Sequence, residues 1–167
     1  MKINRYYLEI NSLSNLNEVK SPDLNLTIEK VSPPNIEISK FFYKNIGKNH
    51  RWIDRLAWDN LKWTSYLENK NVHTYILKLK DDLVGYFETV NDYSSKSSEI
   101  AYFGILDNYI GKKIGGFFLL RSISKSNEMT YKKISHKQWT MWWKPSMGCE
   151  WIYHDQQRAG NRSSNIL

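Results

Sequence analysis

The sequence predicts an α/β (α+β) fold, in which a mostly antiparallel central sheet is flanked by helices. Apolar and polar residues alternate over residues 24–29, which is the pattern of a half-buried strand. Three further strands, expected at 71–80, 83–90 and 99–106, follow one another across short polar turns, and short turns favour antiparallel neighbours. The last strand leads through a glycine-bearing loop into residues 112–124, whose apolar side chains recur at helical spacing.

The N-terminal part of the chain adds a strand and two helices to this plan. Residues 3–10 predict an extended segment. The run Ser-Pro-Pro at 32–34 is typical of a helix start, and Gly47 is a natural stop for that helix. Asp59 can cap a second, short helix.

The composition is that of one globular domain spanning residues 1–167, with 24 Lys and Arg against 17 Asp and Glu, a net charge of +7. The basic residues are spread along the chain and form doublets only at 112–113 and 132–133. Binding to DNA needs a basic patch or stripe, so nucleic acid is not the expected partner. No segment has the ~18 apolar residues of a membrane span, and the N-terminus lacks the apolar run of a signal peptide. We therefore expect a cytoplasmic protein that does not associate with membranes.

A metal centre is not expected. Cys149 is the only cysteine, so no intramolecular disulfide can form. His136, Cys149 and His154 match no zinc-binding spacing and are fewer than the four ligands of a structural zinc site.

The junction between the third strand of the meander and the following helix has the features of an anion site. Unpaired backbone N–H groups and the positive end of the helix dipole meet at a helix N-terminus. Gly111, Gly115 and Gly116 would let a phosphate approach the backbone, and Lys112 and Lys113 add positive charge. The spacing differs from the motifs of nucleotide-triphosphate and dinucleotide sites. The alternative is that the glycines only let the helix pack closely on the sheet.

Three segments of the chain, in order, resemble a bacterial subgroup of the GNAT superfamily of N-acetyltransferases. They are HRWIDRLAWDNLKWTSYL, GYFETV and EIAYFGILDNYIGKKIGGFFLL, and the resemblance covers about residues 5–125. The central motif of the superfamily is Gln/Arg-x-x-Gly-x-Gly/Ala. Aligned on it, Ile110 replaces the usual Gln or Arg, Lys113 replaces the first glycine, and Gly115 takes the last position. The Lys113 side chain could crowd a phosphate or help to hold it.

The resemblance implies a GNAT-like, mixed and mostly antiparallel central sheet, with acetyl-CoA as co-substrate. The strand ending at Ile105 would pair its backbone with the pantetheine arm, and Gly104 suits a bulge that splays this strand from its neighbour. The gap between the strands would then admit the acetyl thioester. The implied coenzyme-binding residues are Ile105, Leu106, Ile110, Gly111, Lys112, Lys113, Ile114, Gly115 and Gly116.

The implied reaction is direct attack of a primary amine on the thioester, without a covalent enzyme intermediate. Glu99 is the first candidate for the general base and Glu88 the second; the alternatives are a solvated strand end and an outward-facing charge. Tyr102 or Tyr86 could donate a proton, or could be packing residues. The acceptor, a small-molecule or peptide amine, would meet an aromatic and basic cluster, whose alternative is packing of Arg on Trp. The cluster and the facing strand supply the candidate acceptor-binding residues Trp52, Arg55, Trp58 and Tyr86.

The C-terminal part, residues 131–167, departs from the family pattern of a strand, a helix and a hairpin. We expect a strand at 139–143, a short helix at 153–160 and otherwise irregular structure, and we interpret this tail as degenerate or frame-shifted. A truncated sheet edge would invite pairing with a second copy, so a homodimer is one open arrangement. The alternative to an active enzyme is a non-catalytic GNAT-like module that binds CoA or a protein partner.

Overall fold

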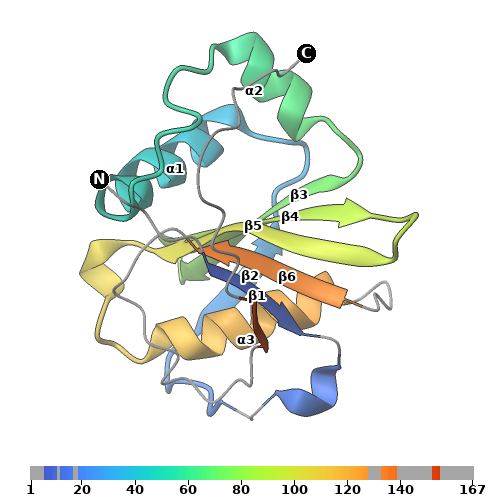
Figure 1. The fold of residues 1–167 in the computed structure, drawn as a ribbon. Helices are drawn as coiled ribbons and strands as arrows, with labels where there is room; N and C mark the ends of the chain where they lie inside the picture. Colours follow the sequence, from blue (N-terminus) through green and yellow to red (C-terminus); the bar gives the residue numbers. More distant parts are fainter. Residues whose placement is uncertain (1–5, 11, 17–18, 128–132, 139–151, 155–167) are drawn as a thin grey trace.

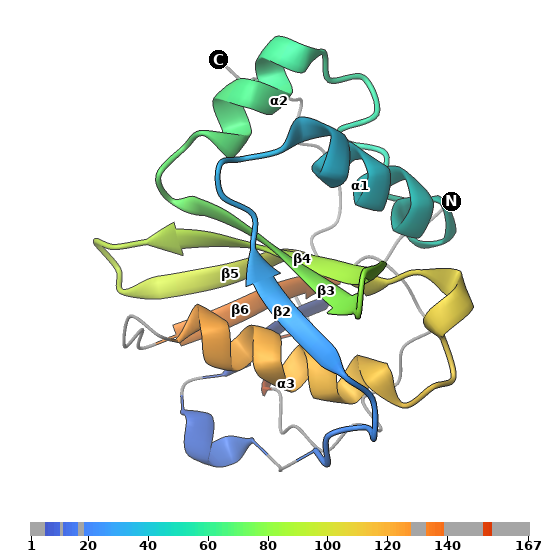
Figure 2. The ribbon, with the colours of Figure 1, turned by 180° about the vertical axis from the view of Figure 1, so that it is seen from behind.

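The computed structural model describes residues 6–10, 12–16, 19–127, 133–138 and 152–154. Its strands form one sheet in the order β2-β3-β4-β5-β6-β1-β7, with α1 and α2 on one face and α3 on the other (Figures 1 and 2). This confirms the predicted α/β class and the mostly antiparallel sheet. The elements are β1 (Tyr6–Ile10), η1 (Leu13–Asn15), β2 (Leu26–Lys30), α1 (Ile36–His50), α2 (Asn60–Leu67), β3 (Val72–Leu79), β4 (Asp82–Asp92), β5 (Ser97–Ile105), η2 (Asp107–Tyr109), α3 (Ile114–Ser126), β6 (Lys133–Gln138) and β7 (Ile152–His154).

The predicted meander is present as β3, β4 and β5, each antiparallel to the next. β2 adds an antiparallel strand next to β3. The alternation of side chains divides the meander between two cores. On the α3 face, the core includes Phe87, Ile100 and Phe118; on the face of α1 and α2 it includes Phe42 and Tyr86.

The pairing of β5 changes character at Ile100. From Ser97 to Ile100 the strand is parallel to β6, but no described strand pairs with that side of β5 over the remaining residues. The register against β4 also shifts here, because Ile100 opposes Thr89 while Tyr102 opposes Glu88. Ala101 is thus the extra residue of a bulge, a feature that bends a strand and increases its twist.

The prediction that Gly104 forms this bulge is wrong. Gly104 lies opposite Tyr86 in regular register. A Cβ atom built at Gly104 would come within 2.5 Å of Cγ2 of Ile46. The glycine therefore lets α1 pack closely on the sheet, and the splay of β5 begins at Ala101.

β6 lies inside the segment that departs from the family pattern, and its position was not expected. It occupies the sheet between β5 and β1, parallel to the first and antiparallel to the second. Ile134 is buried in the same core as Ile10 and Ile100. The strand expected at 139–143 lies outside the described residues. The helix expected at 153–160 is wrong at its start, since residues 153 and 154 belong to β7; its remainder is not described.

The first helix starts and ends differently from the prediction. Its N-cap is Asn35, whose side chain accepts a hydrogen bond from the backbone N–H of Ile38 at 3.0 Å. The helix continues past Gly47, and the glycine instead makes room for Trp52, since a Cβ there would meet Trp52 at 2.7 Å. The helix ends at His50, and Arg51 follows as its C-cap with a left-handed backbone. The predicted cap of α2 is confirmed: Asp59 accepts from the N–H of Lys62 at 2.8 Å. None of the described helices is long and apolar enough to cross a membrane.

Candidate active site

The loop from β5 to α3 forms a cradle of backbone groups. Gly111 has a φ of 82°, a conformation that favours glycine, and a Cβ built there would meet nothing within 4 Å. Lys113 is the N-cap of α3 with a φ of 61°, and its side chain makes no capping hydrogen bond. The first N–H groups of α3 have no partner within the helix, so they can act as donors to an anion.

The nine predicted coenzyme-binding residues follow one another through this cradle, but they contribute in different ways. Ile114, the first residue of α3, is fully buried in the core, so only its backbone can contribute. The backbone N–H of Leu106 already donates to the carbonyl of Val84 at 2.8 Å. Ile110 is 60% exposed. The other six extend from the end of β5 to the first turn of α3: they are Ile105, Gly111, Lys112, Lys113, Gly115 and Gly116.

Two residues at the C-terminus of α1 connect this helix to the cradle. The side-chain amide of Asn49 donates to both carboxylate oxygens of Asp107, at 3.1 and 3.0 Å. Lys48 forms an ion pair with the same carboxylate at 3.3 Å. Asp107 is the first residue of η2, two positions after the last residue of β5. The C-terminal end of α1 is therefore held next to the start of the β5–α3 loop.

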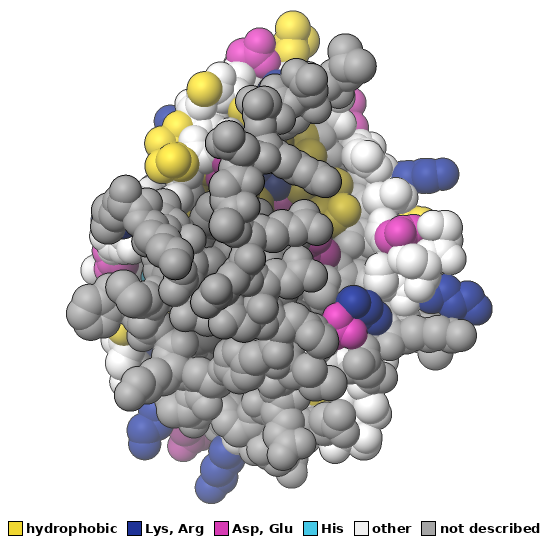
Figure 3. All heavy atoms as spheres, in the orientation of Figure 1, with side chains coloured by type: hydrophobic (Ala, Val, Ile, Leu, Met, Phe, Trp, Pro, Cys, Tyr) yellow, Lys and Arg dark blue, Asp and Glu magenta, His cyan; other side chains and the backbone are white. Residues whose placement is uncertain are grey.

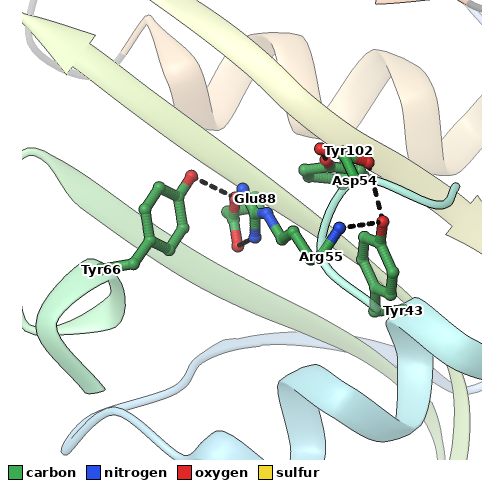
Figure 4. A network of polar contacts seen from close by, with 6 residues as sticks. All are labelled: Tyr43, Asp54, Arg55, Tyr66, Glu88 and Tyr102. Atoms are coloured by element: carbon green, nitrogen blue, oxygen red, sulfur yellow. Dashed lines mark hydrogen bonds and ion pairs between the residues drawn. The ribbon is translucent and has the colours of Figure 1, made fainter. Parts of the chain in front are cut away.

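On the face of the sheet covered by α1 and α2, Arg55 and Glu88 form a buried ion pair (Figure 4). Nη1 of Arg55 donates to Oε2 of Glu88 at 3.0 Å, and Nη2 donates to Oε1 at 2.8 Å. The hydroxyl of Tyr66 donates to Oε1 at 2.6 Å. Glu88 is 0% exposed and Arg55 5% exposed. Burial by itself lowers the pKa of Arg55, but the charge and hydrogen bonds of Glu88 outweigh it and raise the pKa above its usual range.

Aromatic rings enclose the Arg55 guanidinium. Its Cζ atom lies 4.0 Å from the ring centroid of Tyr66, 4.2 Å from that of Tyr102 and 4.8 Å from that of Trp58. Trp63 lies slightly further away, at 5.5 Å. Such contacts stabilise a cation that has left water. The sequence prediction brought Arg55 and Trp58 together correctly, but the arginine already has an internal partner.

The buried pair changes the interpretation of two predicted residues. Glu88 is not the outward-facing charge that was the alternative to a catalytic role, since its carboxylate accepts three hydrogen bonds inside the protein. Tyr86 is buried and stacks on Phe42, with ring centroids 5.1 Å apart. Trp52 is half-buried and lies edge-on to Tyr102 at 4.9 Å. Of these three side chains, only Trp52 reaches the surface.

Asp54 is a site residue that the sequence analysis missed. Its Oδ1 atom accepts from the hydroxyl of Tyr43 at 2.7 Å, and its Oδ2 atom accepts a short hydrogen bond from the hydroxyl of Tyr102 (Figure 4). The hydroxyl of Tyr43 in turn accepts from the backbone N–H of Arg55 at 2.9 Å. Burial raises the pKa of Tyr102 above its usual range; the charge of Arg55 opposes this, and the bond to Asp54 adds to it. The Tyr102 hydroxyl therefore stays protonated at neutral pH.

Glu99 lies in β5, on the same face of the strand as Tyr102. It opposes Val90 of β4 and Ser135 of β6, and its side chain is half-buried. The parallel pairing ends one residue later. Glu99 is consequently at the base of the splay between β5 and β6.

The two histidines that the sequence analysis weighed as metal ligands lie in the C-terminal strands of the sheet. His136 is in β6, opposite Leu8, and His154 is in β7, opposite Tyr7. Cys149 lies outside the described residues. Among the described residues, no three His, Cys, Asp or Glu side chains are grouped so that they could hold a metal ion.

Comparison of the whole chain with solved structures identifies the fold. The GCN5-related N-acetyltransferase from Sphaerobacter thermophilus superposes with a TM-score of 0.59 over 95% of this chain and 45% of that one, at 10% identity. An aminoglycoside acetyltransferase from an uncultured soil metagenomic sample superposes with a TM-score of 0.55 over 66% of this chain and 76% of that one, at 14% identity. The chain has the GNAT fold. The GCN5-related N-acetyltransferase from Kribbella flavida has a TM-score of 0.53 over 92% and 56% of the two chains, at 13% identity. No protein-family model matches, and no curated protein matches by sequence.

The GNAT fold gives the sequence motif a structural setting. The loop that carries the altered motif, from Ile110 to Gly115, joins a splayed central strand to a helix on the opposite face of the sheet from α1 and α2. Of the three segments that resemble the superfamily, the first forms the connection between α1 and α2 together with α2 itself. The second forms the middle of β4, and the third forms most of β5 and the first half of α3. This chain spans about half the length of the Sphaerobacter and Kribbella proteins.

Proposed function

We propose that this protein is an N-acetyltransferase that transfers the acetyl group of acetyl-CoA to a primary amine. One combination of features supports the proposal. In the described part of the chain, no strand pairs with the β6 side of β5 after Ile100, and β5 then enters a loop with a glycine at positive φ and a helix N-terminus without a side-chain cap. A thioester needs an open strand edge beside it, and a pyrophosphate needs backbone donors. The GNAT fold supports both assignments.

The cradle would hold the pyrophosphate through backbone N–H groups at the start of α3. The open space at Gly111 admits a phosphate close to the backbone, because no side chain stands there. Lys112 lies over the ring of Tyr109, with Nζ 4.8 Å from the centroid, which places its ammonium group at the entrance of the loop. The exposed side chain of Lys113 adds a second charge. An anion is favoured here by the helix dipole and by both lysines.

In the proposed reaction, a neutral amine attacks the thioester carbon, a C–N bond forms and the C–S bond breaks. The nitrogen loses one proton before attack and a second as the amide forms; the departing thiolate takes up one, and the other goes to solvent. Glu99 is the candidate for removing the first proton, directly or through water, because Glu88 is occupied by Arg55. A thiol has a pKa of about 8.5, so the thiolate leaves without a strong acid. Since its own pKa is raised, we assign Tyr102 a hydrogen-bonding role.

A second candidate function is a non-catalytic module that binds CoA or a protein partner. The observation that favours it is Lys113, which replaces a motif glycine and holds a left-handed backbone at φ 61°. A side chain at that position could keep the phosphates from the N–H groups behind it. The two functions differ in whether acetyl-CoA is consumed.

Calorimetric titration with acetyl-CoA, followed by an assay of free thiol release with a panel of amines, tests the proposal. We expect micromolar binding that weakens when the pyrophosphate is altered, and amine-dependent thiol release. Binding without turnover of any amine would favour the module. The absence of binding by the folded protein would contradict both CoA-dependent functions.

The substitution Lys113→Glu locates the site, with Lys44→Glu as control. Lys44 is an exposed residue of α1, and its substitution makes the same change in net charge. We expect Lys113→Glu to weaken acetyl-CoA binding about tenfold or more, because the variant loses charge-assisted hydrogen bonds to the phosphates. Lys44→Glu should leave the affinity nearly unchanged, because its charge is distant and screened by salt. Equal effects of the two variants would mean that only net charge attracts the coenzyme.

A further inference from the structure

We propose that the acceptor is a small monoamine with an apolar body, and that the Asp54 carboxylate first binds its ammonium group, which then loses its proton as in the proposed reaction before attack. This inference rests on the proposed acetyltransferase function. It concerns the side of the site formed by the connection between α1 and α2. It also separates this protein from acetyltransferases whose acceptors carry several amines.

Asp54 has the geometry of a preorganised anchor for a cation. Each carboxylate oxygen accepts one tyrosine hydroxyl, Oδ1 from Tyr43 and Oδ2 from Tyr102. A carboxylate offers about four lone-pair sites, so two acceptor sites remain. The residue is exposed although both tyrosines anchor it. Its carboxylate can therefore accept hydrogen bonds from an ammonium without rearranging.

Tyr102 connects this carboxylate to the proposed site of acetyl transfer. The tyrosine belongs to β5 and directly follows the bulged residue Ala101. It thus lies on the first part of the strand that β6 does not pair with. The rings of Trp52 and Tyr102 meet edge-on at 4.9 Å beside it. An amine bound to Asp54 would lie next to aromatic faces, which also attract cations.

Exposed apolar side chains flank Asp54 in the same connection. Ile53 is 71% exposed and Leu56 is 56% exposed. In Figure 3, hydrophobic side chains come to the surface over the part of the molecule where Figure 1 shows α1, α2 and their connection. A ligand that touches Asp54 from solvent can cover these side chains with an apolar body.

The charges around Asp54 disfavour a polycation. The connection of residues 51–58 contains Arg51 and Arg55, and Asp54 is its one acidic residue. The next acidic residue, Asp59, is used as the cap of α2. The whole chain carries a net charge of +7. A second or third ammonium would find like charges here, which costs affinity and slows association.

The test compares kcat/KM for phenethylamine and spermidine in acetyl-CoA-dependent thiol release. We expect phenethylamine to be the better acceptor by about tenfold or more, the factor that one unfavourable charge contact produces. Asp54→Asn should raise KM for phenethylamine about tenfold and leave the affinity for acetyl-CoA unchanged. Asp81→Asn, in the exposed turn between β3 and β4, is the control and should change neither.

Ile53→Ser separates the apolar contact from the charge. It should raise KM for phenethylamine several-fold and leave KM for ethanolamine, which lacks an apolar body, nearly unchanged. Better turnover of spermidine, or an unchanged KM in Asp54→Asn, would overturn the inference while the acetyltransferase function stands. Failure of the wild-type protein to bind acetyl-CoA would instead overturn both.

Discussion

The guanidinium of Arg55 lies against the carboxylate of Glu88 in a two-point ion pair, at 2.8 and 3.0 Å, in the interior of the protein. The two residues come from different parts of the chain, the connection after α1 and the strand β4. The pair therefore fixes the segment that carries Asp54 to the middle of the sheet. Together with the bond from Tyr66, the pair uses three of the roughly four acceptor sites of the Glu88 carboxylate.

Glu88→Gln should destabilise the protein strongly. The substitution preserves the shape of the side chain but leaves the Arg55 cation buried without a counterion, which costs about 3 kcal/mol of unfolding free energy. For a domain of this size, each kcal/mol corresponds to roughly 2–4 °C in Tm. Urea and thermal unfolding, followed by circular dichroism, measure both quantities.

Glu68→Gln is the matched control for this prediction. Glu68 is exposed at the C-terminus of α2, and its removal should change the unfolding free energy by less than about 0.5 kcal/mol. A loss of that small size in Glu88→Gln would mean that water or another group solvates the Arg55 cation. Glu88 would then become a candidate base again.

Gly104→Ala should disturb the packing of α1 on the sheet. The new Cβ atom would lie 2.5 Å from Cγ2 of Ile46, which is itself fully buried. Overpacking of this kind costs about 1–3 kcal/mol of unfolding free energy. Chemical denaturation measures the loss, and wild-type stability of the variant would show that α1 can move away from β5 without cost.

The sequence predicted the elements whose signals are local. The alternation in β2, the short turns that bound β3 and β4, the cap at Asp59 and the helical spacing in α3 are each visible within about ten residues. The order of the three segments that resemble the GNAT superfamily then predicted the overall fold. It also placed Trp52, Arg55 and Trp58 together, because they are neighbours in one short connection.

The sequence did not predict features that depend on residues distant in the chain. Asp54 meets Tyr102 across 48 positions, and a lone aspartate in a loop gives no local sign of such a partner. The bulge at Ala101 depends on the register between β4 and β5, whereas Gly104 only looked like a bulge because of its residue type. β6 pairs in parallel with β5, and its strand pattern was hidden in a segment of unusual composition.

Asp107→Ala should uncouple α1 from the coenzyme loop. It removes the two hydrogen bonds from Asn49 and the ion pair with Lys48. These groups are exposed, so the unfolding free energy should fall by less than about 1 kcal/mol. If the contacts hold the loop in its binding conformation, acetyl-CoA affinity should fall several-fold in calorimetry. Lys48→Ala removes only the ion pair and should have the smaller effect; unchanged affinity in Asp107→Ala would show that the cradle is rigid without α1.

His73 predicts a dependence of stability on pH. Burial lowers the pKa of this half-buried histidine below its ordinary value of 6.5, and the positive charge of Lys30 lowers it further. At a pH between the pKa of His73 in the folded protein and its higher pKa in the unfolded chain, the unfolded chain binds more protons than the folded protein. The unfolding free energy therefore rises with pH over this range. Stability should therefore be lost as the pH falls below 6.5, and fully present above it.

His73→Gln cannot take up the proton, so urea unfolding at about pH 7 and about pH 5.5 should show a smaller loss in the variant than in the wild-type protein. Burial lowers the pKa of His50 as well, against the opposing charge of Asp107, and this histidine supplies part of the slope that His73→Gln retains. An identical slope in the two proteins would mean that His73 accepts its proton in the folded state as readily as in the unfolded chain.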